Sequence, residues 1–327
     1  MTQRFERFLA TVEPGRPAEV VGYQPISGGY SRISARATVR WADGAQESFI
    51  LRGDPPAGSG VFVSDRHAEW ELLQSLPGLG SVATARARWY DSTGAHLGAP
   101  CIVMDCAEAT SLQAVLADSD DIGPLTDLFV DTAAAIHLSP LDRLPASMPR
   151  PTDWSSYLDG VLATYDRIGA DHPAVAPVLR HVTWWAAAHR PPPVPLGLVH
   201  GDCQPSNILV ADDAPPLVID WEFAHVGDPR EDLGYYNQIP LLPNVYWADP
   251  QRFLERYRAA TGMTEDQLNP DVVDYFLIIG MAKLYGQLVE AAAAVGSTPR
   301  PGILATYLIN AMSHQHDMFL SICERQG

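Results

Sequence analysis

The sequence predicts an α+β protein with a small β-rich lobe at its N-terminus and a larger helical lobe after it. Up to Cys106, short segments of alternating apolar and polar residues are separated by turns rich in Gly and Pro. After that residue, apolar side chains recur at helical spacing. A chain of 327 residues is long enough to bury a large core in two lobes. We therefore predict one lobe over residues 1–106 and a second over residues 107–327.

The first lobe is expected to contain strands arranged around one helix. Asp43-Gly44 supplies a hairpin turn between two strands, and Asp65 is placed to begin the helix, which runs to about Ser75. The predicted strands cover residues 20–25, 33–41, 47–52, 86–90 and 101–105.

The second lobe is expected to be mainly helical. Two short strands flank a loop that begins at His200, and Arg190–Pro195 is a stiff connector because it is rich in Pro. The predicted helices cover residues 123–138, 153–168, 173–188, 250–261, 268–294 and 302–322.

Several features of the sequence predict a cytoplasmic protein without a membrane partner. The first seven residues lack the apolar core of a signal peptide, and the apolar run Tyr275–Ala282 is too short to span a bilayer. The four cysteines show no metal-ligand spacing, and scattered thiols fit a reducing compartment.

The charge of the chain is unevenly distributed. Residues 107–327 carry 28 of the 39 acidic and 12 of the 22 basic side chains, so almost all of the net charge of −17 lies there. Solubility alone explains this distribution, and so does an acidic substrate lobe that attracts cations. A nucleic-acid partner is not expected, because the acidic lobe would repel phosphates.

Three polar side chains of the second lobe suggest a site for chemistry on a nucleotide. Asp202 and Asn207 lie five residues apart in a turn-forming loop, and Asp220 ends an apolar run that predicts a buried strand. Two carboxylates and an amide at this spacing suit a site that orients a hydroxyl and holds Mg²⁺ against phosphates. The alternative is that both aspartates only cap helices or turns.

The segments Leu198–Val210 and Val218–Glu222 together resemble the kinase-like small-molecule phosphotransferases, which include aminoglycoside and macrolide phosphotransferases and choline kinase. The resemblance implies a bilobal protein-kinase-like fold. It also implies transfer of a phosphate from ATP or GTP to a hydroxylated small molecule, with Mg²⁺ as cofactor. In that reaction Asp202 would be the general base, and Asn207 and Asp220 would bind the metal.

The same loop argues against a protein kinase. Gly201 and Gln204 stand where protein kinases have Arg and Lys, and no Ala-Pro-Glu follows Asp220-Trp221-Glu222. We expect His200 to brace the loop through hydrogen bonds.

Two segments of the first lobe are expected to contact the nucleotide. The segment Ser27-Gly28-Gly29-Tyr30-Ser31 lies between two predicted strands, where a kinase-like chain covers the phosphates with backbone amides. Taken alone, paired glycines after a strand indicate only a turn. Met104 to Cys106 is expected to be the hinge that faces the adenine.

The chain contains one lysine, Lys283, which lies in the helical half. Arg52 ends the strand where kinases place the lysine that pairs with the α- and β-phosphates. Arg52 is therefore expected to anchor the phosphates, with Glu69 on the following helix as its partner. The alternatives are a surface salt bridge of little consequence and a nucleotide-binding scaffold without turnover. Lys283 is expected to be a helix residue whose ammonium reaches toward water.

The acceptor is not specified by the sequence. Leu51-Arg52 before Pro55-Pro56, with the segment Asp220–Pro229, resembles kinase-like domains associated with acyl-CoA dehydrogenases, some of which phosphorylate hydroxyacyl-CoA or hydroxy acids. An aminoglycoside-type acceptor is the competing interpretation, which the acidic charge favours. Side chains that would line an acceptor pocket, or else belong to the core, are Asp153, Trp154, Tyr157, Glu231, Tyr235, Tyr236 and Trp247.

An anionic acceptor would need a local basic patch. The candidate sources are Arg143 with Arg150, and Arg252 with Arg256 and Arg258. Asp232 is expected to tie the segment after Asp220 to the catalytic loop. The sequence does not determine the oligomeric state.

Overall fold

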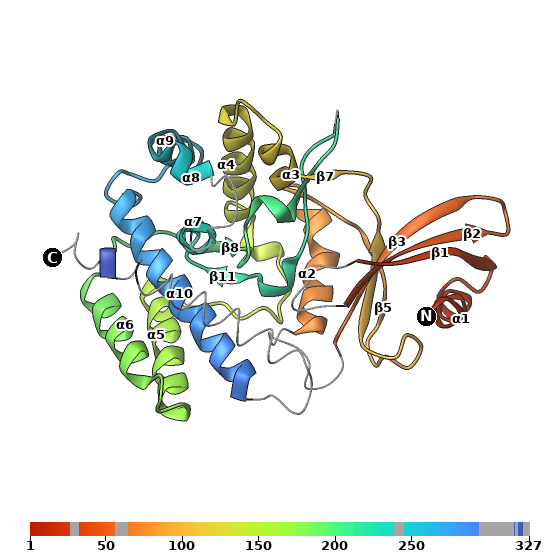
Figure 1. Ribbon diagram of the computed structural model, residues 1–327, viewed down its shortest axis with the longest axis horizontal. Coiled ribbons are helices and arrows are strands. Elements are labelled where there is room, and N and C mark those ends of the chain that lie inside the picture. The colour runs from red at the N-terminus through yellow and green to blue at the C-terminus, as the bar shows by residue number, and fades with distance from the viewer. Residues whose placement is uncertain are drawn as a thin grey trace.

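The structure is a computed structural model that describes residues 1–26, 33–55, 65–212, 214–237, 245–293, 317 and 320–322. It has a β-sheet region at the N-terminus and a helical region at the C-terminus, which lie at opposite ends of an elongated molecule (Figure 1). The predicted α+β fold class is therefore confirmed.

The N-terminal region is a five-stranded antiparallel sheet in the order β1-β2-β3-β6-β5. Burial alternates along β2, where Ala35, Ala37, Val39 and Trp41 are buried, as expected for a strand with one face on a core. The strands are β1 (Ala18–Ile26), β2 (Ile33–Trp41), β3 (Gln46–Gly53), β5 (Ala87–Asp91) and β6 (Cys101–Asp105).

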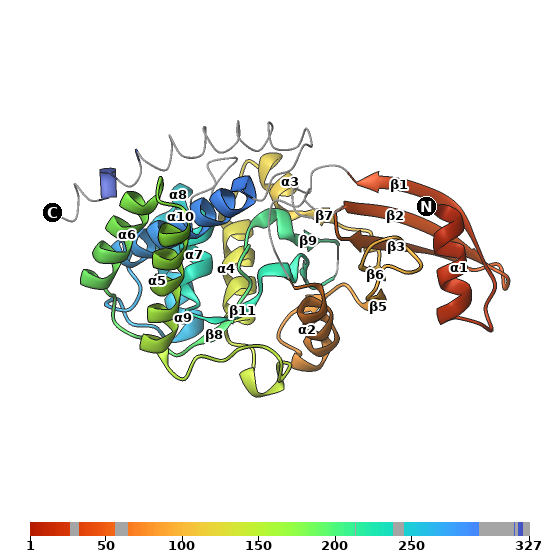
Figure 2. The same cartoon turned by 90° about the horizontal axis from the view of Figure 1, so that it is seen from below.

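A helix that the sequence did not predict, α1 (Thr2–Val12), covers part of this sheet (Figure 2). Its buried side chains Phe5, Phe8 and Leu9 recur at helical spacing and pack against residues of β2 and β3, including Phe49. This small apolar cluster is the core of the N-terminal sheet.

The helix α2 (Arg66–Leu79) lies between the sheet and the helical region (Figure 1). The carboxylate of Asp65 caps it by accepting the N–H groups of His67 and Ala68, as the sequence predicts. After α2, β4 (Ala83–Thr84) pairs with β10 (Leu217–Val218). Two residues from the first hundred thus join a sheet of the second half, with strand order β4-β10-β9-β7.

The helical region packs around two buried apolar clusters, one of which extends to α2. The five long helices predicted over its described part are present, with ends shifted by a few residues. The helices are α3 (Leu112–Ala117), α4 (Gly123–His137), α5 (Trp154–Asp171), α6 (Ala176–Ala188), α7 (Arg230–Asn237), α8 (Val245–Ala248), α9 (Pro250–Thr261) and α10 (Pro270–Ala293). Most of the helix predicted over residues 302–322 lies outside the described residues.

The helix α10 is apolar on all sides. By length and composition, its residues Pro270–Glu290 could span a membrane. However, 78% of the apolar 18-residue segment in this range is buried inside the protein. This burial is the property of a core helix.

Short strands hold the predicted catalytic loop at the centre of the molecule. β8 (Gly197–Val199) leads into the loop and pairs with β11 (His225–Gly227), and β9 (Ile208–Val210) follows the loop and pairs with β10 and with β7 (Thr110–Ser111). Figure 1 shows β8 and β11 between α2 and α10. The loop residues therefore face the junction between the sheet and the helical region.

Candidate active site

The loop after β8 is fixed by a buried carboxylate. Asp232 on α7 accepts the backbone N–H groups of His200 and Gly201, at 2.7 and 2.8 Å. Nε2 of His137 donates to the same carboxylate at 2.9 Å, and the hydroxyl of Tyr257 donates to Nδ1 of His137. The predicted tie between Asp232 and the catalytic loop is therefore confirmed.

Gly201 has a backbone that only glycine adopts without strain at this place. Its φ is +79°, and a Cβ here would lie 2.5 Å from the carbonyl oxygen of Phe223. The arginine that protein kinases carry at this position would not fit.

His200 is fully buried and braces the loop, as the sequence predicts. Its Nε2 donates to the carbonyl oxygen of Ile219 at 2.9 Å, and its Nδ1 accepts the N–H of Asp202 at 3.3 Å. Burial lowers the pKa of His200, although Asp232 opposes this shift. The ring is therefore neutral, with both nitrogens occupied, and holds Asp202 and Ile219 in place.

The carboxylate of Asp202 is oriented by two amide side chains. The amide of Gln204 donates to Oδ1 and the amide of Asn207 donates to Oδ2, each at 2.8 Å. Burial, and next the negative charge of Asp220, raise the pKa of Asp202 to about 7. A carboxylate with this pKa is a stronger base than an exposed one. This property suits a general base that takes a proton from a hydroxyl group.

Asn207 and Asp220 are brought together by the backbone. The carbonyl oxygen of Asn207 accepts the N–H of Ile219 at 2.9 Å, so the backbone of Asn207 lies beside the residue that precedes Asp220. Asp220 has the left-handed conformation, with φ of +70°, and is the one non-glycine residue with positive φ in the described chain. Such a conformation in a non-glycine residue is concentrated at functional sites.

The donor set at these two residues fits a hard divalent cation. Nδ2 of Asn207 is committed to Asp202, so its Oδ1 is turned away and has no hydrogen-bond donor within the described residues. One amide oxygen and one carboxylate suit a cation that takes its other ligands from phosphates and water. The described residues contain no group of three His, Cys, Asp or Glu side chains that would hold a metal alone.

Arg52 on β3 reaches Asp220 directly. Its Nη2 lies 2.5 Å from Oδ1 of Asp220, whereas its Nε lies 4.0 Å from Oε1 of Glu69. The Arg52 and Glu69 side chains are only 10% and 2% exposed, so the pair is not a surface salt bridge. Burial lowers the pKa of Arg52, but Asp220 and then Glu69 outweigh it and leave the pKa raised.

Arg66, which the sequence analysis missed, is the closest described ion-pair partner of Glu69. Its Nη1 lies 2.5 Å from Oε2 of Glu69, and its Nη2 lies 3.1 Å from Asp54. The sequence did contain a signal for the contact between Arg66 and Glu69, because the two residues are three apart at the start of α2. Glu222 also joins the cluster, with Oε1 3.9 Å from Nη2 of Arg52.

The cluster around Arg52 carries more negative than positive charge. Two guanidiniums, of Arg52 and Arg66, face four carboxylates, those of Asp54, Glu69, Asp220 and Glu222. Nε of Arg52 is buried without a hydrogen-bond partner among the described residues. Among the described residues, this excess of carboxylates suits a site that receives a divalent cation.

The predicted nucleotide-contacting segments are only partly described. Ser27, Gly28, Gly29, Tyr30 and Ser31 lie outside the described residues. Met104 is buried on β6, and the N–H groups of Asp105 and Cys106 donate to Arg86 and Ser48. Those two N–H groups are therefore already used, and a nucleotide base at this edge of the sheet would meet other backbone groups.

The residues considered for an acceptor pocket have different surroundings. Asp153 caps α5, and Trp154 donates to Asp228, so both have structural contacts. The hydroxyl of Tyr157 donates a hydrogen bond to the carboxylate of Glu231, near β11. The side chains of Tyr236 and Trp247 lie outside the described residues, and Tyr235 is partly buried.

The arginines considered for a basic patch are already engaged. Arg252 and Arg256 form ion pairs with Asp127 and Asp131. Arg143, Arg150 and Arg258 donate to backbone carbonyl oxygens. The charges of Arg252 and Arg256 are therefore neutralised by ion pairs, whereas Arg143, Arg150 and Arg258 are held by the backbone.

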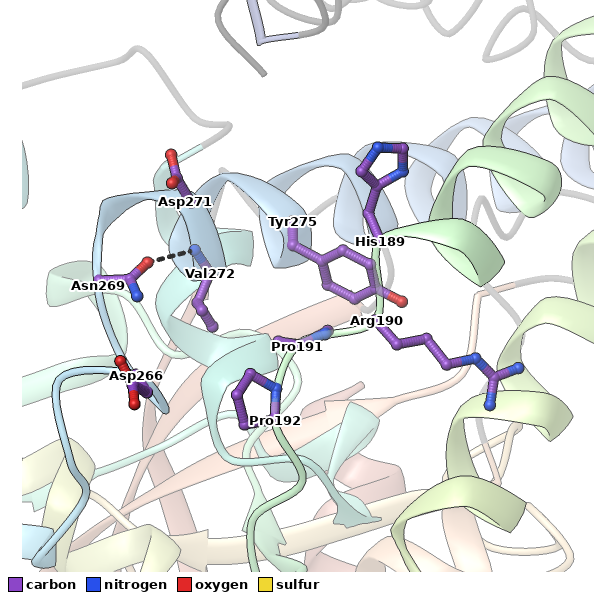
Figure 3. Close-up of a pocket in the computed structure, with 9 residues that line it drawn as sticks. All are labelled: His189, Arg190, Pro191, Pro192, Asp266, Asn269, Asp271, Val272 and Tyr275. Atoms are coloured by element: carbon purple, nitrogen blue, oxygen red, sulfur yellow. Dashed lines mark hydrogen bonds between the residues drawn. The ribbon is translucent and has the colours of Figure 1, made fainter. Parts of the chain in front are cut away.

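A separate cavity of about 520 Å³ lies at the start of α10, beside the Pro-rich connector (Figure 3). None of the residues that line it belongs to the cluster around Asp202 and Asp220. They are His189, Arg190, Pro191, Pro192, Asp266, Asn269, Asp271, Val272 and Tyr275.

The fold of this chain is similar to the folds of several solved structures. A macrolide 2'-phosphotransferase from Brachybacterium faecium aligns with a TM-score of 0.63 at 20% identity, covering 94% of this chain and 97% of that one. An aminoglycoside phosphotransferase in complex with ADP and hygromycin B aligns with a TM-score of 0.64 at 14% identity, covering 96% and 97%. The GDP complex of an aminoglycoside 2'-phosphotransferase aligns with a TM-score of 0.63 at 14% identity, covering 97% and 99%.

The sequence itself matches a family over most of its length. Residues 22–272 match the phosphotransferase enzyme family, a range that contains β3, α2, the catalytic loop and Asp220. The chain therefore belongs to the phosphotransferase enzyme family.

Proposed function

We propose that this protein transfers the γ-phosphate of ATP or GTP to a hydroxyl group of a small molecule in a reaction that requires Mg²⁺. The observation that carries the proposal is the convergence of Asp202, Asn207 and Asp220 with Arg52 at one junction. The structural neighbours with bound ADP or GDP support a nucleotide donor.

Asp202 is the general base in this proposal. Gln204 and Asn207 hold its carboxylate so that it accepts the hydrogen bond, and then the proton, of an acceptor hydroxyl. Positioning of this hydroxyl in line with the γ-phosphate is the main demand of phosphoryl transfer.

Asn207 and Asp220 would hold the metal. There it would supply positive charge against the phosphates. Arg52 anchors the phosphates in place of a lysine, and Glu69 and Glu222 keep its guanidinium charged and oriented. Arg66 supports Glu69 from the opposite side.

One observation favours a second candidate function, a nucleotide-binding scaffold without turnover. Arg52 pairs with Asp220 instead of standing free for phosphates. A protein that binds a nucleotide without turnover would tolerate this arrangement.

The test is incubation with ATP or GTP and Mg²⁺ against hydroxylated antibiotics, hydroxy acids, hydroxyacyl-CoAs and amino alcohols. We expect one acceptor to gain the mass of a single phosphate, and Asp202→Asn to abolish that gain. Tight nucleotide binding with neither transfer nor hydrolysis would establish the scaffold instead.

The proposal extends to organisation and location. Residues 1–106 would cover the nucleotide and residues 107–327 would supply the catalytic loop and the acceptor site. The chain would act in the cytoplasm, where its described free cysteines, Cys101, Cys106 and Cys203, fit a reducing environment.

A further inference from the structure

Lys283 occupies an unusual place for the one lysine of the chain. The other 21 of the 22 basic residues are arginines. Lys283 lies on α10, where its neighbours Ala282 and Leu284 are buried, and its own side chain is 24% exposed. An ammonium on a core helix is costly unless it has anionic partners.

The ammonium of Lys283 contacts a buried carboxylate that also contacts a histidine ring. Nζ lies 3.2 Å from Oε1 of Glu231, while Nε2 of His225 lies 2.9 Å from Oε2. The hydroxyl of Tyr157 also donates to Glu231, and its ring stacks on that of His225. Burial alone would raise the pKa of Glu231, but Lys283 and His225 outweigh it and hold the pKa well below its usual range.

Two groups hold the ring of His225. Nδ1 faces the carbonyl oxygen of Phe223 at 2.9 Å, and Nε2 faces the carboxylate of Glu231. Both ring nitrogens therefore have partners among the described residues, and the ring keeps Glu231 in place beside Lys283.

The neighbouring carboxylates are directed elsewhere. Asp228 forms a buried ion pair with Arg230, and Asp232 accepts from the catalytic loop and His137. In the described part of the chain, Lys283 has one hydrogen bond, to Glu231, so two of its three N–H groups remain for a ligand.

The cluster of Lys283, His225 and Glu231 lies beside the catalytic loop. His225 begins β11 and pairs with Val199 of β8, the last residue before the loop. Glu231 precedes Asp232, whose carboxylate holds the loop. The strands β8 and β11 lie between α2 and α10 (Figure 1). The cluster is thus tied to the loop that carries the proposed base.

We propose that Lys283, with His225 held by Glu231 and Tyr157, binds a carboxylate of the acceptor, so that the protein phosphorylates hydroxy carboxylic acids. The proposal rests on the proposed function. Lys283 supplies the positive charge and the two N–H groups that bind the carboxylate. His225 and Tyr157 hold the carboxylate of Glu231, which orients the ammonium.

The test compares hydroxy acids of graded chain length with their primary amides, which have a similar shape and no charge. For wild-type protein, we expect kcat/KM to be at least about 10-fold higher for the best acid than for its amide. Lys283→Met keeps the length of the side chain and removes the charge. It should lower the acid-to-amide ratio about 10- to 100-fold, mainly through KM for the acid.

Two further variants sharpen the result. Lys283→Arg should keep most of the preference for the acid, because the charge remains. Arg167→Met removes an exposed cation that pairs with Asp171 and Glu290, and should leave the ratio at the wild-type value. Lys283→Gln replaces Lys283→Met if the latter does not fold.

The outcomes separate this inference from the proposed function. Transfer to cationic or neutral acceptors without a preference for acids would overturn the inference and leave the proposed function intact. An equal loss for acid and amide in Lys283→Met would show a purely structural role. If no acceptor is phosphorylated, calorimetric titration of wild-type and Lys283→Met protein with the acids still decides the inference, which requires weaker binding by the variant.

Discussion

The guanidinium of Arg52 and the carboxylate of Asp220 form the shortest described link between the strand β3 and the catalytic half of the chain. Nη2 and Oδ1 lie 2.5 Å apart, although 168 residues separate the two positions in sequence. The proposed phosphate anchor and the proposed metal ligand therefore neutralise each other. A nucleotide with its metal would supply both with new partners, phosphates for Arg52 and a cation for Asp220.

Replacement of Arg52 should affect binding and turnover together. In Arg52→Ala the phosphates lose a partner in both the ground state and the transition state, so we expect KM for the nucleotide to rise and kcat to fall, each about 10-fold. Steady-state kinetics with varied ATP measures both. Arg52→Lys, which restores the usual residue of kinases, should recover part of the loss. Unchanged kinetics in Arg52→Ala would mean that the phosphates bind elsewhere.

Replacement of Asp220 should remove the response to metal. Asp220→Asn is the suitable variant, because asparagine tolerates the left-handed backbone while its amide lacks the charge that binds Mg²⁺. We expect Mg²⁺ to strengthen nucleotide binding by wild-type protein and to have little effect on the variant. Calorimetric titration of ATP with and without Mg²⁺ gives this difference independently of catalysis. The same enhancement by Mg²⁺ in both proteins would contradict the assignment.

Asp202→Asn should lower kcat by roughly 10²-fold or more while nucleotide affinity stays close to that of the wild-type protein. The amide cannot accept a proton, although it has nearly the shape of the carboxylate. The matched control is Asp212→Asn, which changes an exposed carboxylate in the same half of the chain and should leave kcat unaltered. Full turnover by Asp202→Asn would rule out Asp202 as the base.

The stability of the same variant relative to wild-type protein should depend on pH. Because the folded-state pKa of Asp202 is raised to about 7, the folded protein holds a proton there that the unfolded chain loses from about pH 4 upward. Stability of the wild-type protein should therefore fall between about pH 4 and about pH 7. The Tm of Asp202→Asn relative to that of wild-type protein should therefore rise over that range and stay constant below it. Thermal melts of metal-free protein in EDTA test this, and a Tm difference independent of pH would exclude the shift.

The sequence predicted elements whose pattern is local. The five strands of the N-terminal sheet and the long helices of the described region follow from alternation, helical spacing and caps such as Asp65. The helix α1 was missed, although Phe5, Phe8 and Leu9 had the right spacing. The helix α7 was missed because its charged and aromatic residues resemble a loop motif more than an amphipathic helix.

The sequence predicted the members of the site better than their pairings. Asp202, Asn207 and Asp220 were identified from spacing because one loop and one strand bring them together. The contact of Arg52 with Asp220 depends on how β3 and the β9–β10 hairpin are placed, which no local pattern contains. Glu69 was assigned to Arg52, yet Arg66 is closer because it lies one helical turn away on the same helix.

Asp232 supports the final prediction, which concerns the loop and not the chemistry. Its carboxylate accepts three hydrogen bonds, from the N–H groups of His200 and Gly201 and from Nε2 of His137, and burial is complete to within 1%. Asp232→Asn keeps the shape but presents an NH₂ group to at least one of these donors, leaving that donor unsatisfied. A buried unsatisfied donor costs about 1–3 kcal/mol, so Tm should fall by several degrees.

The kinetic effect of Asp232→Asn should differ from that of Asp202→Asn. A displaced loop moves the base relative to the phosphates, so kcat should fall about 10-fold or more, while the nucleotide, which Arg52 and Asp220 still hold, keeps its affinity. Asp228→Asn is the comparison, because that buried carboxylate binds Arg230 and Trp154 and does not contact the loop. It should lower Tm with a smaller effect on kcat. Equal losses of kcat in the two variants at matched Tm would show that Asp232 acts only through general stability.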